Sequence, residues 1–232
     1  MADGHARQAA GPCDKLPPDQ VDAATPGEPM ALTAISKSEA ELKRRAVRQS
    51  ALRSITRHGM LRATVRGLSG TAHRSGRSLN EHCSEHEALI AEIMVAHLDT
   101  LMRRVCDAYD QTATQKPVKR LEAITGAFLA SALDERNEHR LIVRSGDVLD
   151  ETGQVSVIGR YRSLATLFAE VIEASAPNVT PASGKLAAMS LLTTLSGAAL
   201  WFRDDGAIEA AAFAQMLAET AMTMARPSVQ TA

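Results

Sequence analysis

The stretch Arg45–Met94 reads RAVRQSALRSITRHGMLRATVRGLSGTAHRSGRSLNEHCSEHEALIAEIM, and it carries the clearest succession of short helical patterns in the chain. Within Val47–Ile55 an apolar residue recurs every four positions, which places one apolar stripe on a first helix, and Gly59 then ends it. Thr64 can cap a short second helix and Ser75 a third. The stretch therefore predicts a compact unit of three short helices.

Charge is distributed very unevenly around this unit. Between Leu42 and Asn80 there is no Asp or Glu, and the segment holds ten basic residues: Lys43, Arg44, Arg45, Arg48, Arg53, Arg57, Arg62, Arg66, Arg74 and Arg77. Because the whole chain has a net charge of -1, the remainder carries -11. A basic block confined to one segment of an acidic protein is typical of a surface that faces phosphates, whereas a solvated helix face usually mixes both signs.

The composition favours an all-α protein. Apolar residues make up 45% of the 232 residues and aromatic residues only 3%, while Ala, Leu, Met and Arg are abundant. These residues favour helices, and the β-branched and aromatic residues that favour strands are scarce. The length allows one small domain and one larger domain.

The rest of the chain is predicted to be a series of longer helices. Ser84 and Glu87 have the spacing of a capping box, which predicts that a long helix begins there. We expect its buried stripe to contain Leu89, Ile93, Ala96, Leu101 and Val105. Further helices are predicted at about 118–138, 139–149, 155–175, 182–202 and 208–225, with Gly and Pro at the joints.

These patterns predict the domain organisation. The Pro-rich residues 1–38 are expected to be a disordered tail, 39–85 the three-helix domain, 86–226 a larger helical domain and 227–232 a short disordered tail. No apolar run is long enough for a membrane span, and the start lacks the apolar centre of a signal peptide. We therefore expect a cytoplasmic protein with no membrane contact.

The Arg45–Met94 stretch resembles the DNA-binding domain of the tetracycline-repressor (TetR) family, read without a gap. Gly59 matches the glycine after the first helix, Thr64 the second helix, and Ser75 the recognition helix. The run SEHEAL, which starts at Ser84, is similar to the family's S-K-E-x-L. The resemblance implies an N-terminal helix-turn-helix domain, followed by a helical effector-binding and dimerisation domain.

By the same resemblance the protein is a DNA-binding transcriptional regulator, a ligand-responsive homodimeric repressor of an operator in double-stranded DNA, and not an enzyme. Arg77 and Ser78 are then the candidates for contact with base edges. The full set of predicted DNA-binding residues is Arg44, Thr64, Arg66, Ser75, Arg77, Ser78, Asn80, His82 and His86.

The chain departs from the family pattern in its turn and recognition helix. The family's A-G-V-S turn is replaced by a sequence that contains His73 and Arg74, while Asn80 and Cys83 replace the tyrosine and the core phenylalanine. Truncating a core aromatic can cost about 3 to 5 kcal/mol. These departures support an alternative: a diverged member that still dimerises and binds a ligand or partner, but has lost sequence-specific DNA binding.

The C-terminal sequence also resembles TetR-family effector domains. LAAMSLLTTLSGAALWFRDDG, from Leu186 to Gly206, precedes an Ala-rich last helix, and small residues on both helices suit the family's four-helix dimer interface. The stretch HRLIVRSGDVL is similar to regulators that sense acyl-CoA, so the effector is expected to be acyl-CoA or another apolar metabolite. The candidate ligand-pocket residues are Phe128, Tyr161, Phe168, Met189 and Trp201.

Two other interpretations are weaker. His82, Cys83, His86 and Glu87 are residue types that ligate zinc, but a new helix at Ser84 would separate the two histidines, so no metal and no cofactor is expected. An enzyme is disfavoured because no Gly-rich phosphate loop, nucleophile elbow or carboxylate pair stands out.

Overall fold

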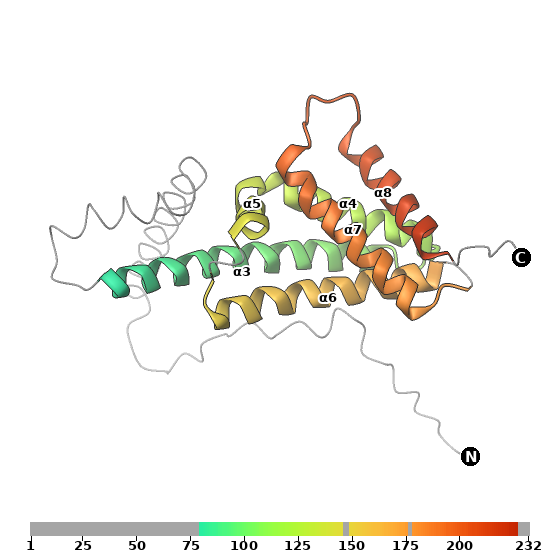
Figure 1. Cartoon of the computed structure of the whole chain (residues 1–232). Helices are drawn as coiled ribbons and strands as arrows, with labels where there is room; N and C mark the ends of the chain where they lie inside the picture. Colours follow the sequence, from blue (N-terminus) through green and yellow to red (C-terminus); the bar gives the residue numbers. More distant parts are fainter. Residues whose placement is uncertain (1–78, 146–148, 176–177, 227–232) are drawn as a thin grey trace, which may run out of the picture.

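The computed structural model of the chain describes residues 79–145, 149–175 and 178–226 (Figure 1). Within these ranges all regular secondary structure is helical, which confirms the all-α prediction. The helices are α3 (Leu79–Gln111), α4 (Pro117–Asp134), α5 (Arg136–Ser145), α6 (Glu151–Ser175), α7 (Pro181–Trp201) and α8 (Ala210–Ala225). None of these helices is long and apolar enough to cross a membrane.

Helix α3 starts earlier than the sequence analysis predicts. It is continuous from Leu79, so Ser84 lies inside the helix and the predicted capping box does not open it. No Gly or Pro stands between Leu79 and Ser84, and a capping residue ends a helix only where the chain leaves the helical conformation. The argument that His82 and His86 lie on separate helices is therefore wrong, because both belong to α3.

The predicted helices after α3 are confirmed, with shifts at their ends. Shifts of about four residues occur at the end of α4, which stops at Asp134 so that α5 begins at Arg136, at the end of α5 and at the start of α6. Pro117 occupies the first turn of α4, where its missing N–H costs no hydrogen bond. At the start of α7, Thr180 and Ser183 form a capping box, and Pro181 between them occupies the first turn.

Helices α3 and α6 lie side by side along the length of the molecule (Figure 1). Helix α4 packs against both of them, α7 packs against α6 and α4, and α8 packs mainly against α4 and α7. At Gly184 a Cβ atom would come within 2.7 Å of the Glu173 side chain, so α6 and α7 approach each other closely at this glycine. The largest buried cluster, which we call the main core, joins residues of α3, α4, α6, α7 and α8, including Phe128, Phe168 and Leu195.

A second, smaller cluster lies nearer the start of α3. It consists of Ile90, Ile93, Met94, Leu98, Leu141, Ile142, Leu149 and Val157, and we call it the α5 cluster because α5 covers it. Of the predicted buried stripe of α3, Ile93, Leu101 and Val105 are buried, while Leu89 and Ala96 are only partly buried. The stripe is thus wider than predicted, and it serves both clusters.

Two arginines of α5 hold the end of α7. Arg140 Nε donates to the Ala199 carbonyl at 2.9 Å, and Arg136 donates to the Phe202 carbonyl at 2.5 Å and to Asp204 at 3.0 Å. The last carbonyls of a helix lack partners within the helix and carry partial negative charge. The two guanidinium groups therefore satisfy these carbonyls and fix α5 against α7.

Candidate functional site

A line of polar side chains separates the two apolar clusters, and it starts on α3 at His97. This histidine is one turn from Ile93 and one turn from Leu101, and its side chain is buried. Ile93, one turn before it, belongs to the α5 cluster, and Leu101, one turn after it, belongs to the main core. A histidine in the middle of a buried helix face needs hydrogen-bond partners, because an unpaired buried polar group is costly.

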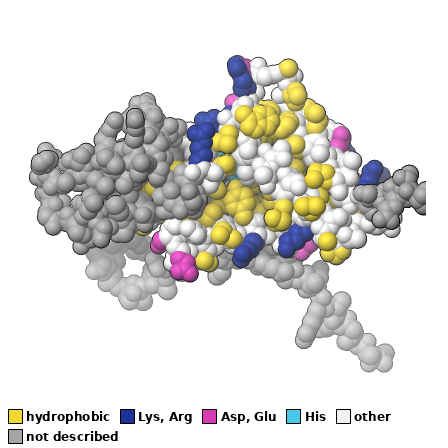
Figure 2. Space-filling view, viewed as in Figure 1, with side chains coloured by type: hydrophobic (Ala, Val, Ile, Leu, Met, Phe, Trp, Pro, Cys, Tyr) yellow, Lys and Arg dark blue, Asp and Glu magenta, His cyan; other side chains and the backbone are white. Residues whose placement is uncertain are grey.

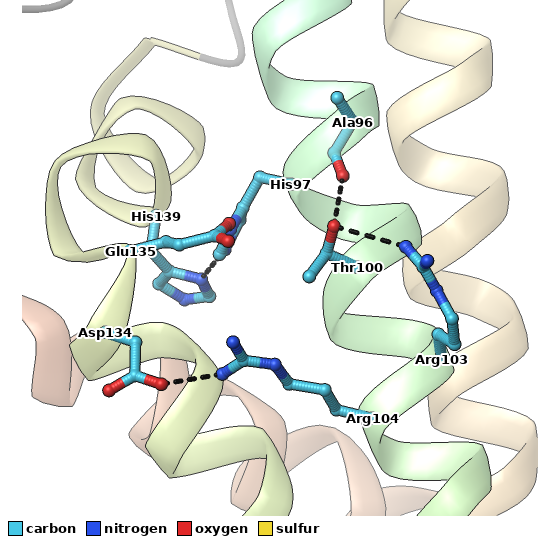
Figure 3. Close-up of polar contacts among 8 residues, drawn as sticks. All are labelled: Ala96, His97, Thr100, Arg103, Arg104, Asp134, Glu135 and His139. Atoms are coloured by element: carbon cyan, nitrogen blue, oxygen red, sulfur yellow. Dashed lines mark hydrogen bonds and ion pairs between the residues drawn. The ribbon is translucent and has the colours of Figure 1, made fainter.

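Glu135 supplies the first partner, from the short turn between α4 and α5. Its backbone N–H donates to the Ser131 carbonyl, and its own carbonyl accepts from the His139 N–H. This places the Glu135 carboxylate 2.6 Å from His97 Nδ1. Figure 3 shows the two side chains next to each other. The side chain of Glu135 remains 34% exposed, so the carboxylate keeps contact with solvent while it binds the buried ring.

His139 of α5 is the second partner. Its Nδ1 lies 2.9 Å from His97 Nε2, and its side chain is completely buried. The Phe128 ring meets the His139 ring edge-on, with centroids 5.7 Å apart. Within the described part of the chain, His139 Nε2 has no hydrogen-bond partner. Such an atom in a native protein calls for an explanation, because buried polar atoms are nearly always paired.

Burial determines the charge of His139. Loss of hydration, and secondarily the charge of His97, lowers the pKa of His139 from 6.5 to about 3. Both effects disfavour the imidazolium form. His139 is therefore neutral near pH 7, with one ring nitrogen that carries a hydrogen and one that carries a lone pair.

Tyr161 of α6 and Ser196 of α7 form a separate polar contact beside the α5 cluster. The Tyr161 hydroxyl lies 3.2 Å from Ser196 Oγ. Burial raises the pKa of Tyr161, an effect that the hydrogen bond to Ser196 opposes, so the phenol stays neutral. On α6, Tyr161 stands between Val157 of the α5 cluster and Leu164 of the main core. We call His97, Glu135, His139, Tyr161 and Ser196 together the polar seam.

The predicted DNA-binding residues lie at or before the start of α3. Arg44, Thr64, Arg66, Ser75, Arg77 and Ser78 fall outside the described residues. Asn80, His82 and His86 lie in the first turns of α3, on the same continuous helix that carries His97. One rigid element thus joins the predicted DNA-contacting segment to the polar seam.

The predicted ligand-pocket residues fall into two groups. Phe128 and Phe168 are fully buried in the main core, edge-on to each other at 6.4 Å, and Tyr161 belongs to the polar seam. Met189 and Trp201 lie on the outer side of α7, with exposed fractions of 53% and 57%. The structure brings the first three around the seam and leaves the last two at the surface.

Sequence reasoning did not identify His97, Glu135 or His139 as site residues. One signal was present: His97 falls between Ile93 and Leu101 in the periodic apolar stripe of α3. Its two partners could not be found in this way. Glu135 and His139 become neighbours of His97 only because α4 ends at Asp134, earlier than the sequence pattern indicates.

The outer face of α7 and α8 forms a second candidate site. Its larger apolar side chains, which we call the α7–α8 face, are Leu186, Met189, Trp201, Met216 and Met224. Figure 2 shows hydrophobic side chains gathered over these two helices. No charged residue occurs from Leu186 to Phe202, and Glu219 is the one charged residue from Ala210 to Ala225. An exposed apolar area of this kind marks an interaction surface.

Comparison with known proteins agrees with this architecture. Residues 114–225 match the family model described as the tetracyclin repressor-like, C-terminal domain. Comparison with curated protein sequences finds no significant match. Among solved structures, the fold is similar to a bacterial regulatory protein in the TetR family from Rhodococcus RHA1, with a TM-score of 0.65 and 18% identity over 80% of this chain and 97% of that one.

Two further solved structures share the fold. One is a TetR-family transcriptional regulator from Bordetella parapertussis 12822, with a TM-score of 0.61 and 18% identity, covering 77% of this chain and 93% of that one. The other is AibR in complex with isovaleryl coenzyme A and operator DNA, with a TM-score of 0.58 and 18% identity over 79% of this chain and 98% of that one. The family model thus shows that residues 114–225 form a tetracyclin repressor-like C-terminal domain, and the solved structures show that the chain shares the fold of TetR-family regulators.

Proposed function

We propose that the protein is a ligand-responsive, homodimeric repressor that binds operator DNA in the cytoplasm. The observation that carries the proposal is a TetR-type C-terminal domain that is preceded by a long helix, α3, which itself follows directly on a segment with ten basic and no acidic residues. Such a segment attracts phosphates, and the family's architecture supplies a helix that enters the major groove. The domain division at about residue 85 is part of this proposal.

Dimerisation is supported by the α7–α8 face. Two copies related by a twofold axis would bury this uncharged apolar surface against itself. Trp201 packs edge-on against Phe213 at 5.5 Å, and Phe213 stacks on Phe202 at 5.2 Å, so aromatic contacts join the two helices at this end. The small residues of both helices, such as Ala212, would allow close packing across the axis.

An effector site at the polar seam is supported by the buried, unpaired nitrogen of His139 and by the contacts around it. A fold neighbour binds isovaleryl coenzyme A, which supports acyl-CoA or another apolar metabolite as the effector. Because His97 sits on α3, a ligand that changed the seam would also shift the helix that leads to the predicted DNA-binding segment. That movement would change the spacing of the two DNA-binding domains, about 34 Å apart on successive major grooves.

DNA binding is tested by a salt titration with fragments from the gene's own upstream region, compared with random DNA of equal length. We expect tight binding to one fragment, a steep salt dependence, and a loss of about 1 to 3 kcal/mol in Arg77→Ala. Equal, weak binding to every fragment would contradict the proposal. It would favour the diverged form, in which the altered turn and recognition helix no longer read an operator.

Dimerisation is tested separately by Met216→Glu, which places a charge on the α7–α8 face where 52% of the side chain is exposed. In a dimer the buried, unpaired charge would weaken association at least about a hundredfold. The matched control is Ala130→Glu, at an exposed position of α4 outside this face. Sedimentation equilibrium should show monomers for the first variant and dimers for the control. Equal behaviour of the two variants would remove the α7–α8 face from the interface.

A further inference from the structure

The hydrogen bonds of the polar seam form a chain with a direction. The carboxylate of Glu135 accepts, so the hydrogen on His97 Nδ1 points toward it. When His97 is neutral, its Nε2 carries a lone pair and must accept from His139 Nδ1. The hydrogen of His139 is then on Nδ1, and its buried Nε2 carries a lone pair that nothing in the described residues satisfies. This chain of hydrogen bonds therefore ends in an acceptor, His139 Nε2.

One added proton reverses this direction without moving a heavy atom. When His97 is protonated, both of its ring nitrogens donate: Nδ1 to Glu135 and Nε2 to His139 Nδ1. His139 stays neutral, since burial lowers its pKa to about 3, and its single hydrogen must then be on Nε2. The chain of hydrogen bonds then ends in a donor, His139 Nε2. In this change the hydrogen of His139 Nδ1 passes to His97 Nε2, and the added proton, which solvent supplies, ends on His139 Nε2.

We infer that His139 Nε2 is the polar anchor of the effector site, and that protonation of His97 decides whether this anchor accepts or donates a hydrogen bond. The inference rests on the proposed function, because it assigns a chemistry to the effector. With neutral His97 the anchor selects an apolar molecule that presents a hydroxyl or N–H group. With protonated His97 it selects a carbonyl, such as that of a thioester.

The surroundings fit a switch located at His97 alone. The charged side chains next to it on each packed element have other partners: Arg104 with Asp134 at 2.7 Å, Asp99 with Arg160 at 2.6 and 3.1 Å, and Arg136 and Arg140 with the end of α7. Figure 3 shows the Arg104–Asp134 pair beside the histidines. Phe128 provides an apolar wall beside the anchor.

The α4 helix offers a second polar atom. Ser131 lies one turn after Phe128, its side chain is fully buried, and its Oγ has no partner among the described residues. Serine Oγ can rotate its hydrogen and serve as donor or acceptor in either state. The role of the Ser131 hydroxyl therefore does not depend on the direction of the hydrogen bonds between His97 and His139, which makes Ser131 a useful control for the role of His139.

The test uses the full-length protein labelled with ¹⁵N in its histidines, without DNA, and two probes. Pyrrole presents a ring N–H that only donates, and cyclobutanone, with the same number of non-hydrogen atoms, has a carbonyl that only accepts. Nitrogen spectra across a pH series report the protonation of His97 and the hydrogen on His139 Nε2, and titrations give the dissociation constant of each probe.

Above the pH at which His97 takes up its proton, pyrrole should bind about tenfold more tightly than cyclobutanone. Below that pH the preference should reverse. His139→Phe should bind neither probe, and Ser131→Ala should keep the reversal of the preference.

The inference is overturned if neither probe binds the wild-type chain, if the preference is the same on both sides of the His97 titration, or if His139→Phe binds as well as wild type. Each of these results leaves DNA binding untouched, since no DNA is present. If no upstream DNA fragment is bound tightly, in turn, the proposed repressor function is contradicted, but the assignment of His139 Nε2 as the polar anchor is not.

Discussion

The main core and the polar seam are both buried among the same helices, but they are built in opposite ways. In the main core, side chains such as Phe168 and Leu195 pack without polar partners, so each contact contributes to stability without constraining any other group. In the seam, the role of each nitrogen depends on its neighbour. The core therefore stabilises the fold, whereas the seam stabilises it less and can exist in two hydrogen-bonded states.

The largest effect should come from the core residue that touches both regions. Phe128→Ala removes a fully buried ring that contacts Phe168 and His139, and should lower the free energy of unfolding by about 3 to 5 kcal/mol. Urea denaturation at fixed protein concentration measures it, with Val155→Ala, at a 66% exposed position of α6, as the control. A loss as small as that of the control would mean that the ring does not pack as described.

The seam should respond differently to single and paired substitution. His97→Leu leaves both Glu135 and His139 Nδ1 without their partner, and should cost about 1 to 3 kcal/mol. Adding His139→Leu removes one of the two stranded groups, so the double variant should be no less stable than His97→Leu alone. Strictly additive losses in the same denaturation assay would show that the two rings are independent, contrary to their 2.9 Å contact.

Acid should destabilise the protein through His139. Its pKa is lowered in the folded state to about 3, so between about pH 6.5 and pH 3 the unfolded state binds an extra proton and stability falls as the pH falls. From pH 7.5 to 5.5 this amounts to about 1 kcal/mol. His139→Phe should lose that much less than wild type over the same range. Identical pH profiles would show that His139 is not held neutral by burial.

The smallest effect is expected outside both regions, at the link between α3 and α6. Arg160 binds Asp99 through two hydrogen bonds, yet the pair is partly exposed, so Asp99→Asn should cost less than about 1 kcal/mol. Asp205→Asn, which breaks a pair with both side chains mostly exposed, should have no measurable effect. A loss at Asp99 as large as that at His97 would extend the functional region to this pair.

The contrast between core and seam also explains what could be predicted from sequence. Apolar periodicity predicted the helices after α3, because burial on one side of a helix repeats along the chain. The start of α3 was predicted wrongly, since Ser84 has the residue type of a cap but lies within a continuous helix. Caps depend on the conformation of the preceding residues, which residue type alone does not determine.

Site prediction depended on the same distinction. Phe128 and Tyr161 were singled out as large side chains and do lie at the seam, while Met189 and Trp201, chosen on the same ground, lie at the surface. Size does not tell which side of a helix is covered. The seam itself joins residues 38 and 42 positions apart, and only the packing of α3 against α4 and α5 brings them together.

The most direct test of the account is amide hydrogen exchange of the full chain, with and without its upstream DNA fragment. If α3 couples the DNA-binding segment to the seam, DNA should change exchange around His97 and His139 and leave the α7 and α8 segments around Ala188 and Ala218 unchanged. Unchanged exchange around His97 and His139, or an equal change in all four segments, would contradict the seam as the link between effector and DNA.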